Sequence, residues 1–276
     1  GAHLVSRRWN DISSGWSYGG AARTMYGSIY RQRECGRCRQ ARPRRVRVPC
    51  SVLPPDHGQM GSGMDASYEA WIAHCFDHPV HDPAWHFDAD ALEWPASPTV
   101  TLVHLTRFFS NPSAVLAPYS DAQINQGLWY IADAFSPFDA ALPSADRTAC
   151  IAAMTGLYDE LFAPRCAPTL GHAPDGAGGE RPLNSACYMW WDLLRVAPLR
   201  RVPGRAAMDD AALAVMRHAL QLDAIACHES ALHGLGHWAG GYPAEVQTAI
   251  DAFLERGDVH PAIREYARHA REGHVL

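Results

Sequence analysis

A regular pattern of hydrophobic and polar positions begins shortly after residue 64. Hydrophobic side chains recur there at intervals of three and four residues, at Tyr68, Trp71, Ile72, Cys75 and Phe76. Because an α-helix turns once every 3.6 residues, side chains at this spacing lie on one face. The pattern therefore predicts an amphipathic helix that buries this face against other parts of the chain.

The same spacing returns in later segments of the chain. It is carried by Leu102, Leu105 and Phe109; by Ile124, Leu128, Ile131 and Phe135; by Ile151, Met154, Tyr158 and Leu161; by Cys187, Trp190, Trp191 and Leu194; and by Leu213, Met216 and Leu220. Proline falls mainly near the ends of these segments, where its missing N–H costs least. We expect Asn184 and Asp209 to cap the helices that follow them. No segment shows sustained alternation of β-branched and polar residues, so the pattern predicts an all-α protein.

The most regular pattern spans residues 222–272. Ile225, His228, Leu232 and Leu235 form one stripe, and a Gly-Gly-Tyr-Pro turn separates them from a second stripe of Val246, Ile250, Phe253 and Leu254. The stretch CHESALHGLGHWAGGYPAEVQTAIDAFLERG resembles a HEAT-type repeat, in which paired helices stack on neighbouring pairs. The resemblance implies a scaffold that binds partners, usually without catalysis. The predicted fold class is all-α, with stacked antiparallel helical pairs of the α-solenoid or HEAT-like type and an irregular N-terminal leader.

Charge divides the chain into two unlike parts. The sequence contains no Lys, and its 24 basic residues are all Arg. Eleven Arg and three acids give residues 1–63 a net charge of +8, whereas 13 Arg and 26 acids give residues 64–276 a net charge of −13. An acidic body disfavours binding to nucleic acid or to an anionic membrane surface. Eight Cys in 276 residues are too few for a disulfide scaffold, so we expect a cytoplasmic protein with free thiols.

Residues 1–63 lack a helical or strand period, and three interpretations remain open. The segment is a disordered basic arm, a zinc knuckle, or translated upstream sequence that precedes a native start at Met60 or Met64. The zinc knuckle would use Cys35, Cys38, Cys50 and His57. We favour the third interpretation, which divides the chain into a leader of residues 1–63 and a single helical domain of residues 64–276.

The first candidate metal site lies on the predicted helix around residue 230. Glu229, His233 and His237 are spaced four residues apart and therefore project from one strip of the helix surface. A His pair at this spacing can chelate a transition metal, and a carboxylate one turn away can be a third ligand. The zincin signature needs His-Glu-x-x-His, which His228-Glu229 and His233 miss by one residue. We favour the interpretation that these side chains form hydrogen bonds with a neighbouring helix or its connecting loop.

The second candidate lies in the long connection of residues 77–98. His78, His81 and Asp82 occur there, and the His-Asp doublet resembles that of helical HD-type phosphohydrolases, in which such a doublet ligates metal ions. Pro83 follows the doublet and disfavours the helical conformation that it has in that family. Long connections are nevertheless often functional.

Tryptophan supplies the candidate binding residues. Trp190 and Trp191 are adjacent on a predicted helix, so they point about 100° apart, and one of them can line a groove while the other packs in the core. Trp85 and Trp238 are further candidates for contact with a partner. Packing of both adjacent rings in the core is the simpler interpretation.

These patterns lead to two functional hypotheses. The first is a non-catalytic helical-repeat protein that binds a protein partner through a groove between helices and has no cofactor. The alternative is a metal-dependent hydrolase that uses a divalent transition metal such as Zn²⁺, held by the His-rich residues 74–86, by the Glu229, His233 and His237 stripe, or by both. Neither hypothesis places the chain in a membrane, because no segment of the sequence is long and apolar enough to span one.

Overall fold

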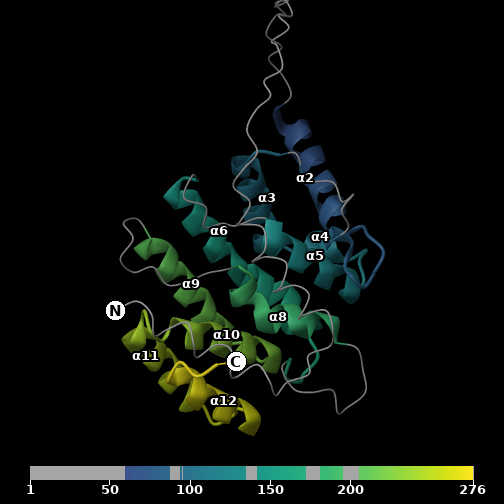
Figure 1. Cartoon of the computed structure of the whole chain (residues 1–276). Coiled ribbons are helices and arrows are strands. Elements are labelled where there is room, and N and C mark those ends of the chain that lie inside the picture. The colour runs from purple at the N-terminus through teal and green to yellow at the C-terminus, as the bar shows by residue number, and fades with distance from the viewer. Residues whose placement is uncertain are drawn as a thin grey trace, which may run out of the picture. The chain divides into compact units, whose positions relative to one another are not determined.

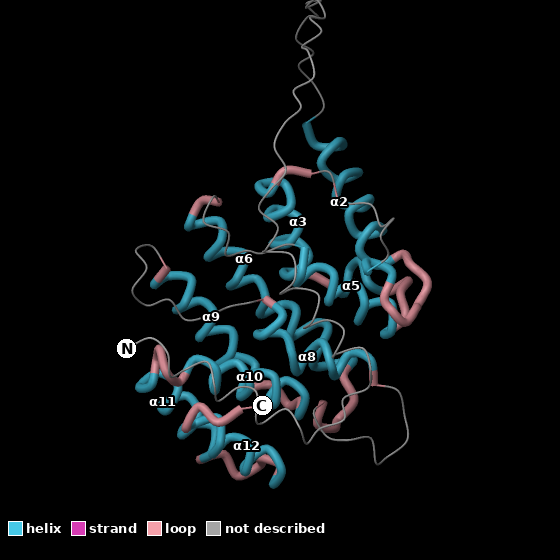
Figure 2. The backbone as a smooth tube through the Cα atoms, viewed as in Figure 1, coloured by secondary structure: helices cyan, strands magenta, loops and turns pink. Residues whose placement is uncertain are grey.

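The computed structural model describes residues 60–87, 94, 96–134, 142–171, 181–194 and 205–275, and every regular element in these ranges is helical (Figure 1; Figure 2). The all-α prediction is therefore confirmed for this part of the chain. Within it, no helix combines the length and the apolar character that crossing a bilayer requires. Cys35, Cys38, Cys50 and His57, the residues of the zinc-knuckle interpretation, lie outside the described residues.

The main helices follow the predicted segments closely. They are α2 (Met60–Phe76), α3 (Pro98–Ser110), α5 (Asp121–Ala134), α6 (Ser144–Leu157), α8 (Pro182–Leu193), α9 (Ala206–Ala219), α10 (Ile225–Trp238), α11 (Pro243–Leu254) and α12 (Pro261–Arg271). Shorter elements are the 3-10 turn η1 (Trp85–Phe87), α4 (Ser113–Leu116), the π-helical turn η2 (Tyr158–Phe162) and α7 (Ala163–Arg165). Helix α2 begins at Met60, which lies within the segment predicted to be a leader. The described helices all belong to one compact unit, Gln59–Leu276.

Two predicted helix caps are wrong. Helix α8 begins at Pro182, so Asn184 lies in its first turn, where its side chain binds the backbone of Ala167 and Thr169. Helix α9 begins at Ala206, and the buried Asp209 accepts a hydrogen bond from the Tyr242 hydroxyl at 2.7 Å. Both side chains therefore form hydrogen bonds between segments that are distant in the sequence. Local sequence spacing does not reveal such bonds.

Helix α10 is central to the C-terminal half of the domain. It packs against α8, α9, α11 and α12, while α6 packs against α3 and α9 (Figure 1). Because neighbours cover it on several sides, residues on almost every face of α10 are buried, including the polar Glu229, Ser230 and His233. A buried helix of this kind needs partners for its polar side chains within the protein.

Glycine permits the closest approach of α10 to its neighbours. A Cβ atom at Gly234 would stand 2.6 Å from Cδ1 of Trp191 on α8 and 2.9 Å from Sδ of Met216 on α9. Neither neighbour can move freely, because both side chains are buried in the hydrophobic core. The absence of a side chain at Gly234 therefore sets the distance between α8 and α10.

We predict that Gly234→Ala lowers the free energy of unfolding by about 1–3 kcal/mol, because it overpacks the contact with Trp191. Urea denaturation followed by circular dichroism measures the change. The matched control is Gly240→Ala, since a Cβ atom at Gly240 would have no heavy atom within 4 Å. Equal stability of the two variants would contradict this account of the helix contact.

Candidate metal centre

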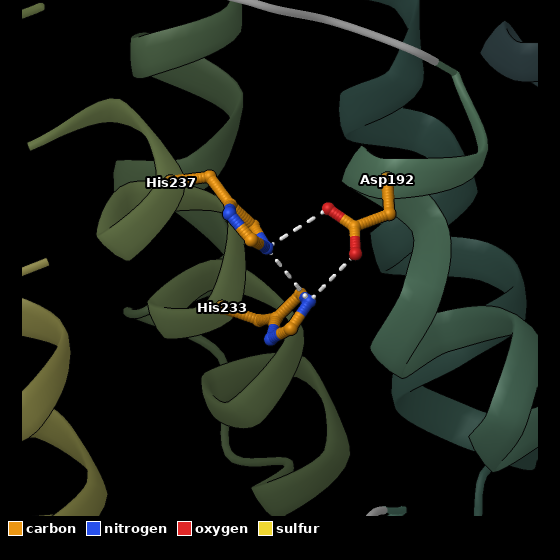
Figure 3. Close-up of side chains that lie close together, drawn as sticks. All are labelled: Asp192, His233 and His237. Carbon is orange, nitrogen blue, oxygen red and sulfur yellow. Dashed lines mark hydrogen bonds and ion pairs between the residues drawn. The ribbon is translucent and has the colours of Figure 1, made fainter. Parts of the chain in front are cut away.

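Two helices bring three metal-ligating side chains together at the contact between α8 and α10. His233 and His237 lie one turn apart on α10, and Asp192 faces them from the last turn of α8 (Figure 3). Within the described part of the chain, these three are the group of His, Cys, Asp or Glu side chains close enough to hold one metal ion. Both histidines of the predicted pair belong to this group, and the carboxylate beside them comes from a different helix.

The ligand atoms are arranged in a small triangle. Nε2 of His233 is 3.0 Å from Oδ2 of Asp192, Nε2 of His237 is 3.0 Å from Oδ1, and the two Nε2 atoms are 3.2 Å apart. Atoms bound to one ion at about 2.1 Å stand roughly 3.0–3.4 Å apart in octahedral or tetrahedral geometry. The three side chains thus already have the spacing of ligands around one transition-metal ion.

The triangle has one buried corner and two accessible corners. The side chain of His233 is 0% exposed, whereas that of His237 is 38% exposed and that of Asp192 is 27% exposed. A ligand set that opens to solvent on one side can accept a further ligand from solution, as catalytic metal sites do.

Tyr266 on α12 contacts the ring nitrogen of His233 that points away from Asp192. Its hydroxyl lies 2.8 Å from Nδ1 of His233, while the ring of Tyr188 packs against the imidazole with centroids 4.4 Å apart. Burial raises the pKa of Tyr266 well above its ordinary value, helped by the neighbouring Tyr188, so the phenol stays protonated. A fixed partner at Nδ1 orients the ring and directs Nε2 towards Asp192.

The carboxylate of Asp192 is charged over the whole range near neutral pH. Burial alone would raise its pKa, but hydrogen bonds and charge interactions with His233 and His237 outweigh burial and hold the pKa of Asp192 well below its ordinary value. The centre therefore carries one full negative charge beside two imidazole nitrogens, which favours a bound cation.

Glu229 does not join this group, which corrects the predicted ligand stripe. Its carboxylate is fully buried, and Oε2 accepts a hydrogen bond from the backbone N–H of Gly171 at 2.5 Å. Glu229 lies one turn before His233 on α10, where its carboxylate binds the segment after α7 and not the histidines or Asp192. It binds a neighbouring segment, as the simpler interpretation of this residue predicted.

His228 is a core histidine, as its position on an apolar stripe indicates. Nε2 lies 2.6 Å from the carbonyl oxygen of Leu222, and the ring packs against Phe253. Burial lowers the pKa of His228 below its ordinary value, so the neutral form is favoured.

The second candidate site does not assemble among the described residues. His78 stacks on Trp85 with ring centroids 3.7 Å apart, and Nε2 of His78 lies 2.8 Å from the carbonyl oxygen of His74. His81 and Asp82 lie in an exposed loop, and neither belongs to the group of side chains that could hold a metal. The aromatic and imidazole rings of this segment are packed against one another rather than directed at a common point.

The tryptophans predicted to bind a partner lie mostly in the core. Trp190 and Trp238 are 0% exposed and Trp191 is 2% exposed, so these three side chains offer no surface to a partner and their predicted role is corrected. Trp85 is half-buried and packs against Tyr130 as well as His78. Core packing was the simpler prediction for the adjacent pair.

Asp192 is the site residue that sequence reasoning missed. It follows Trp190 and Trp191 directly and is the one charged residue in Pro182–Leu193. A single carboxylate at the end of an otherwise apolar helix is the signal that could have drawn attention to it, because buried or half-buried acids need a partner.

No family model, curated protein or solved structure matches the chain. The functional argument therefore depends on the geometry of these side chains.

We predict that Asp192→Ala lowers the free energy of unfolding of the metal-free protein by about 1–3 kcal/mol, because it leaves Nε2 of the buried His233 without its acceptor. Urea denaturation in the presence of EDTA measures the loss. Asp159→Ala is the matched control, since Asp159 pairs with His218 at 2.6 Å on the exposed surface and such pairs contribute about 0–1 kcal/mol. A larger loss in the control than in Asp192→Ala would contradict this account.

Proposed function

We propose that this chain binds one divalent transition-metal ion through Asp192, His233 and His237 and uses it as a hydrolytic centre. The observation that carries the proposal is the convergence of two Nε2 atoms and one carboxylate within 3.0–3.2 Å of one another. The proposal keeps the alternative hypothesis from the sequence, a metal-dependent hydrolase, with Asp192 in place of Glu229.

In the absence of a metal ion, each arrangement of protons on these three groups carries a local cost. If both Nε2 atoms carry a proton and donate to the two oxygens of Asp192, two positively polarised N–H groups lie side by side with their nitrogens 3.2 Å apart. If one of them lacks its proton, one oxygen of the charged carboxylate faces a nitrogen lone pair. A cation bound to both nitrogens and to the carboxylate removes both conflicts, because all three groups then present lone pairs to a positive charge.

The donor set favours Zn²⁺ or Fe²⁺. Two imidazoles and one carboxylate occur as protein ligands in catalytic zinc sites and in non-haem iron sites. Carboxylate-only cages, which suit Mg²⁺ and Ca²⁺, lack the nitrogen ligands that dominate here. Zn²⁺ is our first choice, because the two histidines lie one turn apart on a helix as they do in helical zinc sites.

Three protein ligands leave at least one coordination position for water. The exposed sides of His237 and Asp192 give solvent access to that position. Zn²⁺ held by these side chains would lower the pKa of a bound water molecule to about 7 and would thereby supply a nucleophile near neutral pH. Attack of such a nucleophile on an ester, an amide or a phosphoester is the reaction class that this arrangement supports.

The HEAT-type arrangement, a cytoplasmic location and a non-catalytic partner-binding role remain predictions from the sequence. The packing of α10 on α12 and of α11 on α12 is compatible with stacked helical pairs over residues 222–272. The partner-binding role has lost Trp190, Trp191 and Trp238 as candidate contacts, since these side chains are buried. The metal centre is therefore the better supported proposal.

Elemental analysis of the purified chain without a His tag tests the proposal. We predict about one equivalent of Zn or Fe per chain. The double variant His233→Ala with His237→Ala is expected to lose it, because a single carboxylate cannot retain the ion. His218→Ala, which removes a histidine paired with an acid on the exposed surface, is expected to keep it. Absence of metal from the native chain after reconstitution, or its retention by the double variant, would refute the proposal.

We predict further that Tyr266→Phe weakens metal binding about 10- to 100-fold, because it removes the acceptor for the Nδ1 proton of metal-bound His233. Competition with a chromogenic chelator measures the affinity. Tyr242→Phe is the control, since the Tyr242 hydroxyl binds Asp209 instead. Equal affinities of the native chain and Tyr266→Phe would show that Tyr266 does not orient the ligand.

A further inference from the structure

A cleft of about 430 Å³ adjoins the candidate metal centre. It lies among the C-terminal end of α10, the first turns of α11 and the end of α12 with the turn that follows it, and His237 forms part of its wall. His237 thus belongs to both features, as a metal ligand on one side and as a cleft residue on the other. His237 is the shared residue, since Asp192 and His233 are not among the residues that line the cleft.

Small residues keep the cleft open. Gly236, Gly240 and Gly273 lie on its wall, and a Cβ atom at Gly240 would meet no heavy atom within 4 Å. At Gly236 a Cβ atom would instead overlap the side chain of Val275, so the C-terminal turn packs tightly on α10 there. The wall is therefore closely packed where Val275 meets Gly236, whereas there is free space beside Gly240.

The polar side chains of the cleft include one oriented cation. Arg271 donates from Nε to Oδ1 of Asp251 at 2.6 Å and from Nη2 to Oδ2 at 2.9 Å. This bidentate ion pair fixes the plane of the guanidinium group, and it uses Nε and Nη2 but not Nη1. Glu272 also lines the cleft, but its side chain is 67% exposed and lies 3.6 Å from His274.

We propose that this cleft binds the substrate of the metal centre, and that the substrate is a small molecule with a carboxylate or phosphate group. The proposal rests on the metal centre proposed above. A divalent ion with the single carboxylate of Asp192 retains one net positive charge, which attracts an oxyanion. Arg271, which also lines the cleft, supplies a second cationic group for such an anion.

The size of the cleft limits the substrate. Pockets for small molecules commonly enclose about 300–1,000 Å³. A cleft of about 430 Å³ lies near the lower end of this range, so it accommodates a small metabolite or the end of a peptide rather than a folded macromolecule.

The test uses the full chain loaded with Co²⁺, whose visible absorption reports changes in its ligands. Inorganic phosphate and imidazole are titrated as an anionic and a neutral metal ligand. Gly240→Trp is designed to fill the cleft and is expected to weaken both probes by more than about tenfold while Co²⁺ stays bound. Gly257→Trp is the matched control, because Gly257 also has open space around it but does not line the cleft. It is expected to bind both probes like the native chain.

A second variant covers the case in which Gly240→Trp fails to fold. Gln247 is exposed and lines the same cleft, so Gln247→Trp is expected to block the probes in the same way. Arg271→Gln tests the chemical class of the substrate. It is expected to weaken phosphate about tenfold and to leave imidazole unchanged, because only the anion uses the guanidinium.

The outcomes separate the two proposals. Failure of the native chain to bind Co²⁺ would overturn the metal centre itself. Binding of Co²⁺ with unchanged probe affinities in both cleft-filling variants would overturn the cleft as the substrate site and leave the metal centre standing. Equal effects of Arg271→Gln on phosphate and imidazole would overturn the assignment of an oxyanion substrate.

Discussion

The close packing of α8 against α10 determines both the core and the candidate metal centre. Trp191 packs over Gly234, where a side chain as small as alanine would stand within 2.6 Å of the indole ring. Asp192 is the next residue after Trp191 on α8, and His233 is the residue before Gly234 on α10. These two neighbours face each other in the same helix contact. Since Trp191 is buried in the core and Asp192 reaches the accessible edge, a single helix contact sets the separation of the hydrophobic groups and that of the metal-ligating groups. A change in this distance would alter the stability of the domain and the geometry of the site together.

Burial of a polar imidazole explains why the site is built as it is. His233 has no exposed surface, so both of its ring nitrogens need partners within the protein, and Tyr266 and Asp192 supply them. Tyr266 comes from α12 and Asp192 from α8, so three helices must be in place before the ring is satisfied. His237 has no such constraint, because its side chain is 38% exposed, and it also lines the cleft. The site is thus rigid on its buried side and accessible on the other, which is the arrangement expected of a metal centre that exchanges ligands.

The features that the sequence could predict are those that depend on local periodicity. The helical stripes of α2, α10 and α11 follow from spacing alone, and so does the common face of His233 and His237. Asp192 could not be identified in this way, because its role depends on which helix packs against α10, and no local pattern specifies a contact between residues 41 positions apart. Glu229 was misassigned for the same reason, since its position on the stripe is correct but the neighbour in front of it is a loop. The capping roles expected of Asn184 and Asp209 were overridden by long-range hydrogen bonds.

Anomalous X-ray diffraction from crystals of the full chain grown with Zn²⁺ tests the central claim most directly. The account predicts one anomalous peak per chain between α8 and α10, at about 2.0–2.2 Å from Nε2 of His233, Nε2 of His237 and a carboxylate oxygen of Asp192. It also predicts that the hydroxyl of Tyr266 stays within hydrogen-bonding distance of Nδ1 of His233. An anomalous peak at other side chains would contradict the account. So would direct hydrogen bonds between Asp192 and both histidines that persist at saturating Zn²⁺.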